Sequence, residues 1–307
     1  MSAAVGVDVG GTKVAAGVVA ADGQIAPRTR RDSPAGDGGE IVDAIVGAIG
    51  DLGPAAKGLP IGVGAAGIVD LDGVMRYSPN LAWTDLPLRR VLSERLGCAV
   101  TVENDGNAAA WGEFRAGAAA AAHLSAVMVT VGTGVGGGLV LDGRLVRGAD
   151  GLGGELGHVI VAEGGRRCSC GNAGCLESYA SGTAIATAAA ELRQQGEVPV
   201  GSPLDRDAVG GTEVSRAAIE GDPTAQRVMA ETGGWLGVGL ASIANALDPE
   251  VLVIGGGAIA AGDLLLTPAR EAFRARLIGR QHRRVPPVVP AALGPEAGII
   301  GAALLAR

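Results

Sequence analysis

Apolar residues follow two spacings along this chain, and together the spacings predict alternating β-strands and α-helices. Short apolar runs over 4–9, 13–21, 24–29 and 61–66 are typical of strands, the first two forming a hairpin. Between them, apolar positions repeat at helical spacing over 40–49. Pro87 and Gly97 are start and stop signals for a helix over 88–96. A short strand over 99–102 and a helix over 106–115 complete the first part.

The second part of the chain repeats the opening pattern. An apolar strand over 125–131, a glycine-rich turn over 132–138 and a return strand over 139–141 match the order of Val5–Val19, which suggests an internal duplication. Helices are predicted over 184–193, 225–247, 270–278 and 298–306, with a buried strand over 251–254. Residues 194–211 are rich in Gly, Pro, Asp and Ser without periodicity and predict a loop.

Composition and charge limit the classes of partner. The 307 residues are 48% hydrophobic, enough for one large domain or two lobes. A net charge of −7 and only 2% aromatic residues disfavour nucleic acid and anionic membranes, so small molecules are the expected partners. No apolar window reaches the roughly 20 residues needed to span a bilayer. Asp8 interrupts the first apolar run, so we expect no secretion signal and a cytoplasmic protein.

Three glycine clusters each follow an apolar strand and are candidates for holding phosphate. Backbone N–H groups of such turns can approach a triphosphate because no side chain blocks them. Neither the Walker nor the dinucleotide motif fits the spacing. Asp8 is a candidate for water-mediated Mg²⁺ binding or a turn cap, and Lys13 for a phosphate contact or a solvated lysine. Any one cluster alone could be an ordinary tight turn. The clusters are 8–13, 132–138 and 255–257.

Three cysteines lie within eight positions, which points to a metal and not to disulfides. Cys168, Cys170 and Cys175, with His158 nearby, supply a complete tetrahedral set for structural Zn²⁺. Four protein ligands leave no position for a reactive water, so the metal would organise a loop. The alternative is a set of free thiols beside a core histidine.

Carboxylates near this metal set and before a helix are the candidate chemical groups. Glu155 and Glu177 flank the cluster and would be positioned by it, unless they are ordinary surface carboxylates. The ring nitrogen of His158 that does not bind Zn²⁺ would donate to a substrate hydroxyl. Asp105 follows a short strand just before a helix, where it is either a catalytic group at a sheet edge or a helix cap.

These residues jointly resemble the ROK family of repressors and sugar kinases, and within it the bacterial glucokinases. The resemblance covers nearly the whole chain. Its most specific pieces are Gly-Glu-Leu-Gly-His over 154–158 and Cys-x-Cys-Gly-x-x-Gly-Cys-x-Glu over 168–177. The other matching segments are 8–13, 64–67, 78–81, 103–105, 131–153 and 254–257.

The resemblance implies an α/β, two-lobed actin-like ATPase (ribonuclease H-like) fold with a cleft between the lobes. Residues 1–112, joined by a C-terminal helix over 297–307, would form the small lobe, and 113–296 the large lobe with the zinc site. It also implies phosphorylation of glucose by ATP and Mg²⁺, in a homo-oligomer that is a dimer or a tetramer.

The resemblance also implies residue roles. Asp105 would be the base that takes the proton of the sugar's 6-hydroxyl. The sugar side would comprise Gly67, Asn80, Asn104, Asp105, Glu155, His158 and Glu177. The ATP side would comprise Asp8, Gly10, Gly11, Thr12, Lys13, Thr133, Gly134, Gly256 and Gly257.

Several alternatives stay open at this point. The sugar could be mannose, N-acetylglucosamine or fructose, although Glu177 and Asn80-Leu81-Ala82-Trp83 favour glucose, and the donor could be polyphosphate. A non-catalytic sugar-binding regulator is a further alternative. A family repressor would need a helix-turn-helix domain before the turn that starts at Asp8, and we expect none there.

Overall fold

The computed structural model describes residues 2–21, 23–34, 37–78, 81 and 83–307. They form two compact units, the first comprising 1–128, 137–154 and 291–307 and the second 129–136 and 155–290. The lobe limits expected from the sequence stay a prediction. In the part of the chain that the structure describes, no helix has the length and apolarity needed to cross a membrane.

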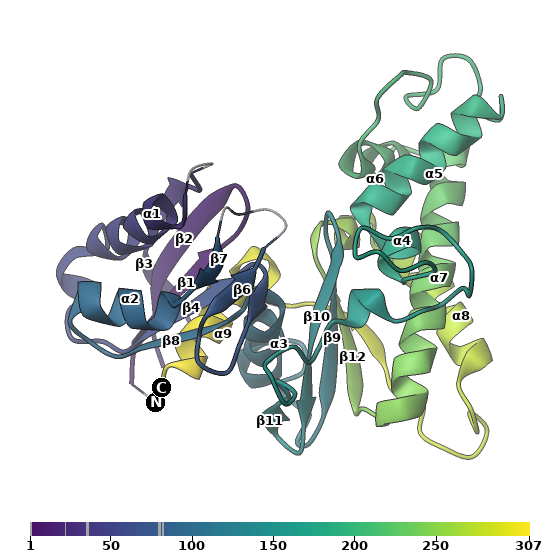
Figure 1. The fold of residues 1–307 in the computed structure, drawn as a ribbon. Helices are drawn as coiled ribbons and strands as arrows, with labels where there is room; N and C mark the ends of the chain where they lie inside the picture. The colour runs from purple at the N-terminus through teal and green to yellow at the C-terminus, as the bar shows by residue number, and fades with distance from the viewer. Residues whose placement is uncertain (1, 22, 35–36, 79–80, 82) are drawn as a thin grey trace. The chain divides into compact units, whose positions relative to one another are not determined.

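The first unit is built on a five-stranded sheet of order β3-β2-β1-β4-β8 (Figure 1). β1, β2 and β3 are antiparallel, whereas β1, β4 and β8 are parallel, so the carboxyl ends of these three strands meet at one edge. The strands are β1 (Ala4–Val9), β2 (Lys13–Val19), β3 (Ile25–Asp32), β4 (Ile61–Ala65) and β8 (Val100–Asn104). The unit's helices are α1 (Gly38–Gly50), α2 (Leu88–Leu96), α3 (Asp105–Ala116) and α9 (Ala297–Leu305).

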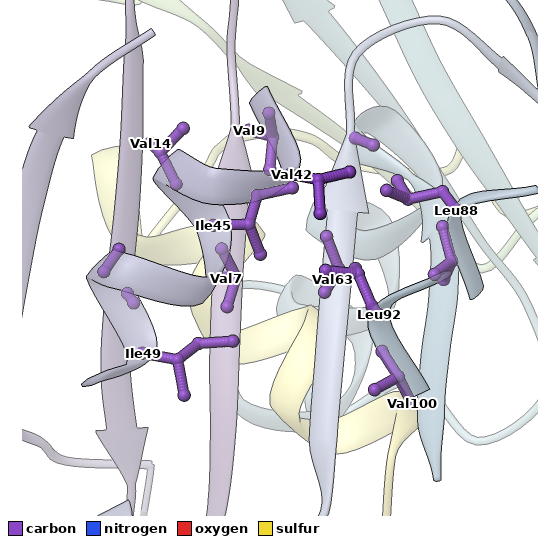
Figure 2. Packing of buried hydrophobic residues seen from close by; sticks show 14 of the residues in the cluster. Val7, Val9, Val14, Val42, Ile45, Ile49, Val63, Leu88, Leu92 and Val100 are labelled. Carbon is purple, nitrogen blue, oxygen red and sulfur yellow. The ribbon is translucent and has the colours of Figure 1, made fainter. Parts of the chain in front are cut away.

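Alternation along β1 decides which helices cover which face of this sheet. Val5, Val7 and Val9 belong to the apolar cluster that α1 and α2 close, as Figure 2 shows for Val7, Val9, Ile45 and Leu92. On the other face lies Gly6, where a Cβ would overlap the carbonyl oxygen of Ile299 in α9. Glycine in β1 therefore allows α9 to pack directly on the sheet backbone.

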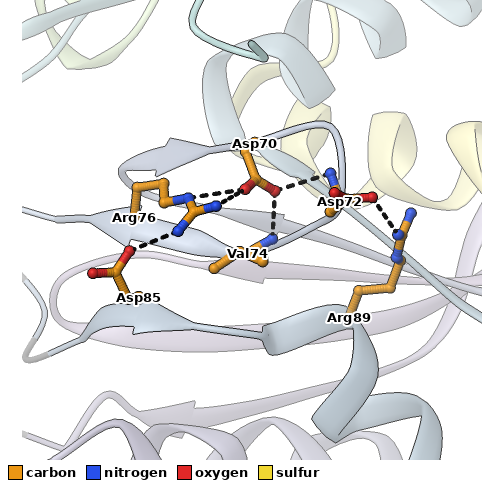
Figure 3. Close-up of polar contacts among 6 residues, drawn as sticks. All are labelled: Asp70, Asp72, Val74, Arg76, Asp85 and Arg89. Atoms are coloured by element: carbon orange, nitrogen blue, oxygen red, sulfur yellow. Dashed lines mark hydrogen bonds and ion pairs between the residues drawn. The ribbon is translucent and has the colours of Figure 1, made fainter.

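A small antiparallel sheet extends the first unit. It has the order β5-β6-β7, with β5 (Ile68–Val69), β6 (Met75–Tyr77) and β7 (Thr84–Leu86). Asp70 ties its turn together by accepting hydrogen bonds from the backbone N–H groups of Asp72 and Val74 and from Arg76, which also pairs with Asp85 (Figure 3). Burial favours a higher pKa for Asp70, but these hydrogen bonds outweigh it and hold the pKa below its usual value.

The second five-stranded sheet repeats the plan of the first. Its order, β11-β10-β9-β12-β13, again places a hairpin beside a strand that comes later in the chain, as the suggested duplication requires. Its strands are β9 (Ala126–Val131), β10 (Val135–Leu141), β11 (Arg144–Leu145), β12 (Val251–Gly255) and β13 (Val288–Pro290). The helices of the second unit are α4 (Glu177–Ala180), α5 (Gly182–Gln194), α6 (Gly211–Ile219), α7 (Pro223–Leu247) and α8 (Asp263–Arg276). Four 3-10 helices are described: η1 (Gly53–Ala56), η2 (Leu156–His158), η3 (Gly257–Ala261) and η4 (Gly294–Glu296).

Two predicted element limits are wrong. The glycine-rich turn ends at Gly134, because Val135–Leu141 is one strand that includes Gly136, Gly137 and Gly138. These glycines serve close packing, since a Cβ on Gly138 would lie 2.6 Å from the Cβ of Ala110 in α3. The helix predicted over 270–278 spans Asp263–Arg276, with Pro268 inside it.

Candidate active site

Two carboxylates meet at the carboxyl edge of the first sheet. Asp8 near the end of β1 pairs in register with Gly64 of β4, and Gly64 pairs with Glu103 of β8, two residues before Asp105. Glycine at position 64 lets α3 pack closely on β4, because a Cβ there would lie 3.2 Å from the Cβ of Ala108 in α3. Parallel strands thus bring together two acids that are far apart in the sequence.

Asp105 is the first residue of α3, and its carboxylate is held from two sides. Its Oδ1 accepts a hydrogen bond from the N–H of Gly106 (2.9 Å) and one from the Nδ2 of Asn104 (3.1 Å). The helix cap is Asn104, whose side chain accepts from the N–H of Asn107. Asp105 is therefore not needed as a cap and is available for chemistry.

The electrostatics of this pair favour protonation. Burial raises the pKa of Asp105 above its usual value, against the opposing hydrogen bonds from Gly106 and Asn104. Burial, and secondly the charge of Asp105, raise the pKa of Asp8 to about 6, while Lys13 opposes the shift. An acid with such a pKa gains proton affinity, which suits a general base.

A hydrogen-bonding network centred on the buried carboxylate of Glu103 lies at the start of α3, and the sequence does not predict its partners. Glu103 accepts from the N–H of Asn104 (2.9 Å) and from the Nδ2 of Asn107 (3.0 Å), and Arg147 pairs with it at 2.5 Å. Arg147 lies more than 40 positions away, so no local pattern could have pointed to it. The network fixes the start of α3 and with it the direction of Asp105.

Gly67 and the turn over 10–13 complete the first unit's share of the predicted residues. Gly67 has φ +128°, which a glycine adopts readily, and its carbonyl accepts from the Nδ2 of Asn104 (3.0 Å). The N–H of Gly10 donates to the carbonyl of Lys13 (2.9 Å) and closes the turn, leaving Gly11 and Thr12 exposed at its tip. Asn80 lies outside the described residues.

The four predicted metal ligands converge in the second unit. One ligand atom from each of His158, Cys168, Cys170 and Cys175 lies within 4.8 Å of every other. The Sγ atoms of Cys170 and Cys175 are 3.7 Å apart, as are the Sγ of Cys168 and the Nδ1 of His158. Tetrahedral Zn²⁺ with bonds of about 2.3 Å to sulfur requires edges of roughly 3.8 Å, so the residues fit this ion.

Two glycines explain the spacing of the cysteines in the loop over 168–175, which we call the metal loop. Gly171 and Gly174 have φ of +96° and +85°. A Cβ on Gly174 would also overlap the carbonyl oxygen of Ala162, so no other residue fits there.

Burial raises the pKa of Cys175 to about 12, with smaller contributions from the neighbouring thiols of Cys170 and Cys168.

Glu177 connects the metal loop to the glycine-rich turn over 132–134, the second of the candidate phosphate-binding turns. Its Oε2 accepts from the N–H of Val135 (2.9 Å), and its Oε1 lies 3.8 Å from the Sγ of Cys168. A Cβ on Gly134 would overlap the same carboxylate. The Oε2 of Glu155 lies 4.0 Å from the Nε2 of His158, on the side of the ring away from Cys168.

A pocket of about 660 Å³ opens beside this turn in the second unit. The turn is held by the start of α5, where the N–H of Gly182 donates to the carbonyl of Gly132 (2.7 Å) and the Oγ1 of Thr183 to that of Thr133 (2.9 Å). Gly256, at φ +85°, lies so close to Val131 that a Cβ would overlap its backbone. The pocket is lined by residues 132–133, 182–186, 210–219 and 257–260 in part, and so by Thr133 and Gly257 of the predicted set.

A family model described as "ROK family" matches residues 4–307. The chain belongs to the ROK family. The two-lobed actin-like ATPase fold follows for this ROK protein, and solved ROK structures share it along their whole length.

Full-length relatives of this ROK protein are sugar kinases. The glucokinase of Streptomyces coelicolor is 39% identical over 316 residues, covering 100% of this chain and 98% of the relative. The structure of a ROK family glucokinase from Streptomyces griseus in complex with glucose and AMPPNP is 40% identical, has a TM-score of 0.85 and covers 100% of this chain and 99% of that one. The ROK hexokinase of Thermus thermophilus is 39% identical, with a TM-score of 0.85 and coverage of 99% and 97%.

Proposed function

We propose that this chain is a glucokinase that transfers the γ-phosphoryl group of ATP to the 6-hydroxyl of glucose, giving glucose 6-phosphate and ADP. The observation that carries the proposal is the end-to-end likeness to glucokinases, one of them solved with glucose and AMPPNP. The Asp105 carboxylate, positioned by Gly106 and Asn104, supplies the base that such a reaction needs.

Asp105 acts on the acceptor hydroxyl. Its carboxylate takes the proton of the 6-hydroxyl while that oxygen bonds to the γ-phosphorus, and the bond from phosphorus to the β,γ-bridging oxygen breaks to release ADP. Burial around Asp105 strengthens this proton transfer, because the carboxylate's proton affinity is raised there. Positioning and charge neutralisation supply the rest of the catalysis.

Other hydrogen-bonding groups of the predicted set would hold the remaining sugar hydroxyls. Asn104 and the backbone at Gly67 would serve from the first unit, and Glu155, His158 and Glu177 from the second. His158 turns Nδ1 toward Cys168, so its Nε2 is the nitrogen left for a hydroxyl. That the two sets face one hollow stays a prediction.

ATP would lie against the turns at Gly10–Lys13, Thr133–Gly134 and Gly256–Gly257, with its base in the 660 Å³ pocket. Asp8 would hold Mg²⁺ through water, and Mg²⁺ when bound neutralises phosphate charge. His158, Cys168, Cys170 and Cys175 would hold Zn²⁺, which would fix the loop that leads to Glu177. We also propose a cytoplasmic homo-oligomer, which gel filtration with light scattering would test.

Purified protein supplied with a panel of sugars and phosphate donors tests the function. We expect ADP release with ATP and glucose, and a higher kcat/KM for glucose than for mannose, fructose or N-acetylglucosamine. Since one of the similar solved structures is a ROK hexokinase, a broader sugar range is the second candidate, and similar kcat/KM values across hexoses would favour it. If the protein turned over with polyphosphate but not with ATP, polyphosphate would be the phosphate donor. If no pair of sugar and donor gave turnover, the protein would be a sugar-binding regulator.

A further inference from the structure

Arg147, just after β11, is the cation that faces the buried carboxylate of Glu103. Its Nε lies 2.5 Å from the Oε2 of Glu103, whose side chain is only 5% exposed. This Nε is itself buried and makes no aligned hydrogen bond in the described part of the chain, so the contact is mainly one between charges. A buried carboxylate is costly unless a cation or hydrogen bonds compensate it. Arg147 therefore supplies charge that keeps Glu103 inside the protein.

The other oxygen of Glu103 connects this charge to the candidate base. Oε1 accepts from the N–H of Asn104 and the Nδ2 of Asn107, and the N–H of Asn107 in turn donates to the Oδ1 of Asn104. The Asn104 amide is thereby turned so that its Nδ2 donates to the Oδ1 of Asp105 and to the carbonyl of Gly67. If Glu103 left its place, two donors would lose their acceptor, and the direction of the Asn104 side chain would no longer be fixed.

Arg147 also closes a loop over 147–154, which we call the glycine loop. Its carbonyl accepts from the N–H of Gly153 (2.8 Å), so the loop returns to the residue at which it starts. Gly148 has φ +76°, and a Cβ there would lie 3.1 Å from the backbone nitrogen of Gly153. The carbonyl of Arg147 thus holds the end of the loop, while its side chain ties the start of the loop to Glu103.

The glycine loop lies against β5 and α3, and its last residue leads into Glu155. A Cβ on Gly151 would lie 2.6 Å from the carbonyl oxygen of Val69 in β5, and one on Gly154 would lie 3.2 Å from the Oδ1 of Asn107 in α3. Both glycines have positive φ, at +87° and +97°. Because Glu155 follows Gly154 in the chain, the position of the loop's end limits where the Glu155 side chain can lie.

We propose that Arg147 is a positioning residue of the sugar site, acting through Glu103 on the direction of Asp105. It also anchors the glycine loop, and with it the start of Glu155. This inference rests on the proposed function, because it assigns Arg147 to the same site. Loss of Arg147 should affect glucose turnover and glucose affinity but not the affinity for ATP, whose proposed contacts lie in the three glycine-rich turns.

Steady-state kinetics of three variants tests the proposal, once circular dichroism has shown which of them fold. Arg147→Gln should lower kcat/KM for glucose about 10- to 100-fold, through both a lower kcat and a higher KM, because Glu103 is then buried without its cation. The KM for ATP should stay unchanged. Adding Glu103→Gln to Arg147→Gln should restore part of the lost activity, since the buried charge is gone while an acceptor oxygen is kept. Arg144→Gln, at an exposed arginine of β11, should change neither constant.

Several results would overturn the proposal. Normal glucose kinetics in Arg147→Gln would mean that the arginine positions nothing, and an equal rise in both KM values would mean a general loss of structure. A double variant no more active than Arg147→Gln would take the effect away from Glu103. If Arg147→Gln does not fold, the charge-balanced double variant should still fold, and its failure to do so would contradict the argument from charge.

The unchanged protein separates this inference from the proposed function. If it phosphorylates no hexose, the proposed function fails and this inference fails with it. If it phosphorylates glucose with ATP, any of the contrary results above removes the role of Arg147 alone.

Discussion

At the scale of single residues, the proposed chemistry depends on two buried carboxylates, those of Asp8 and Asp105. The carboxylate of Asp105 accepts hydrogen bonds from Gly106 and Asn104, and its charge helps to raise the pKa of Asp8. We assign proton transfer to Asp105 and Mg²⁺ binding to Asp8, and separate substitutions can test the two roles.

Asp105→Asn should lower kcat by about 100- to 10,000-fold, the usual contribution of a general base, because the amide cannot accept the hydroxyl proton. Glucose binding should change little, since the amide keeps the shape and hydrogen-bonding capacity of the side chain. Steady-state kinetics and calorimetry measure the two quantities. Asp207→Asn, at an exposed position, is the matched control, and near-normal kcat in Asp105→Asn would remove the base role.

Asp8 should make the folded protein less stable as pH rises. Its pKa is about 6 when folded and 3.8 when unfolded, so the folded state holds the proton more tightly. Its contribution to the free energy of unfolding is therefore greatest below pH 3.8 and falls by about 3 kcal/mol as pH rises to about 6. Urea unfolding without Mg²⁺, from about pH 4 to about pH 7, should show this fall, and Asp8→Asn should lack it. Identical pH dependence in both proteins would contradict the assignment.

Sequence spacing predicted those residues whose partners are local. The Cys-x-Cys motif and the nearby histidine were sufficient to propose a metal set, and their ligand atoms converge. Glu103 belongs to the motif over 103–105, but no local pattern in the sequence points to its partner Arg147. Their pairing depends on the path of the chain from β8 to the segment after β11, and residue spacing alone does not give that path.

At the scale of elements, a glycine can end a helix or permit close packing inside a strand, and the sequence alone does not distinguish these two roles. Gly97 ends α2 with φ +65°, as predicted. Gly136, Gly137 and Gly138 instead lie inside β10, where α3 approaches the strand. The small sheet β5-β6-β7 was not predicted, because two- and three-residue strands carry little periodic signal. Helix α6 was not predicted either, because it begins at Gly211 after the glycine N-cap Gly210, and paired glycines are typical of a loop.

Two glycines in α7 should respond oppositely to alanine. A Cβ on Gly237 would overlap the carbonyl oxygen of Ala269 in α8, whereas nothing lies within 4 Å of a Cβ on Gly234. Gly237→Ala should cost about 1–3 kcal/mol through overpacking. Gly234→Ala should add about 0.5–1 kcal/mol through helix propensity. Urea denaturation measures both, and each variant is the other's control. Equal effects would mean that α7 and α8 are less closely packed than described.

The metal loop should lose its order with its metal. Cys168→Ser should lose bound zinc, measured by elemental analysis, and raise the KM for glucose roughly tenfold, about 1.4 kcal/mol, because Glu177 and His158 are then poorly positioned. Cys98→Ser, at an exposed cysteine outside the cluster, should change neither quantity. Unchanged KM in zinc-free protein would separate the loop from sugar binding.

At the scale of the whole molecule, the first unit is completed by residues from the far end of the sequence. Gly6 and Gly62 admit α9 onto β1 and β4. Buried Glu113 of α3 accepts hydrogen bonds from the N–H groups of Ala292 (3.1 Å) and Leu293 (2.8 Å), just before that helix. The returning segment is thus anchored by a carboxylate as well as by apolar packing.

Deleting residues 297–307 should destabilise the first unit. Ile299 and Ile300 are almost completely buried, and each such side chain contributes about 1.5–3 kcal/mol. Their sum, about 3–6 kcal/mol, reaches the lower end of the net stability of a typical domain, about 5–15 kcal/mol. Hydrogen exchange should show lost protection in β1 and β4, with α7 as an internal reference. Full protection of β1 in the shortened chain would contradict this role for α9.

The position of α9 also affects how the protein is made. During translation β1, β2 and β4 leave the ribosome first, but the helix that covers one face of their sheet is synthesised more than 230 residues later than β4. At about 5–20 residues per second, that face stays uncovered for roughly 10 to 50 seconds. The nascent chain therefore has an extended interval in which chaperones could bind this sheet, and the second unit has the opportunity to fold before the first is complete.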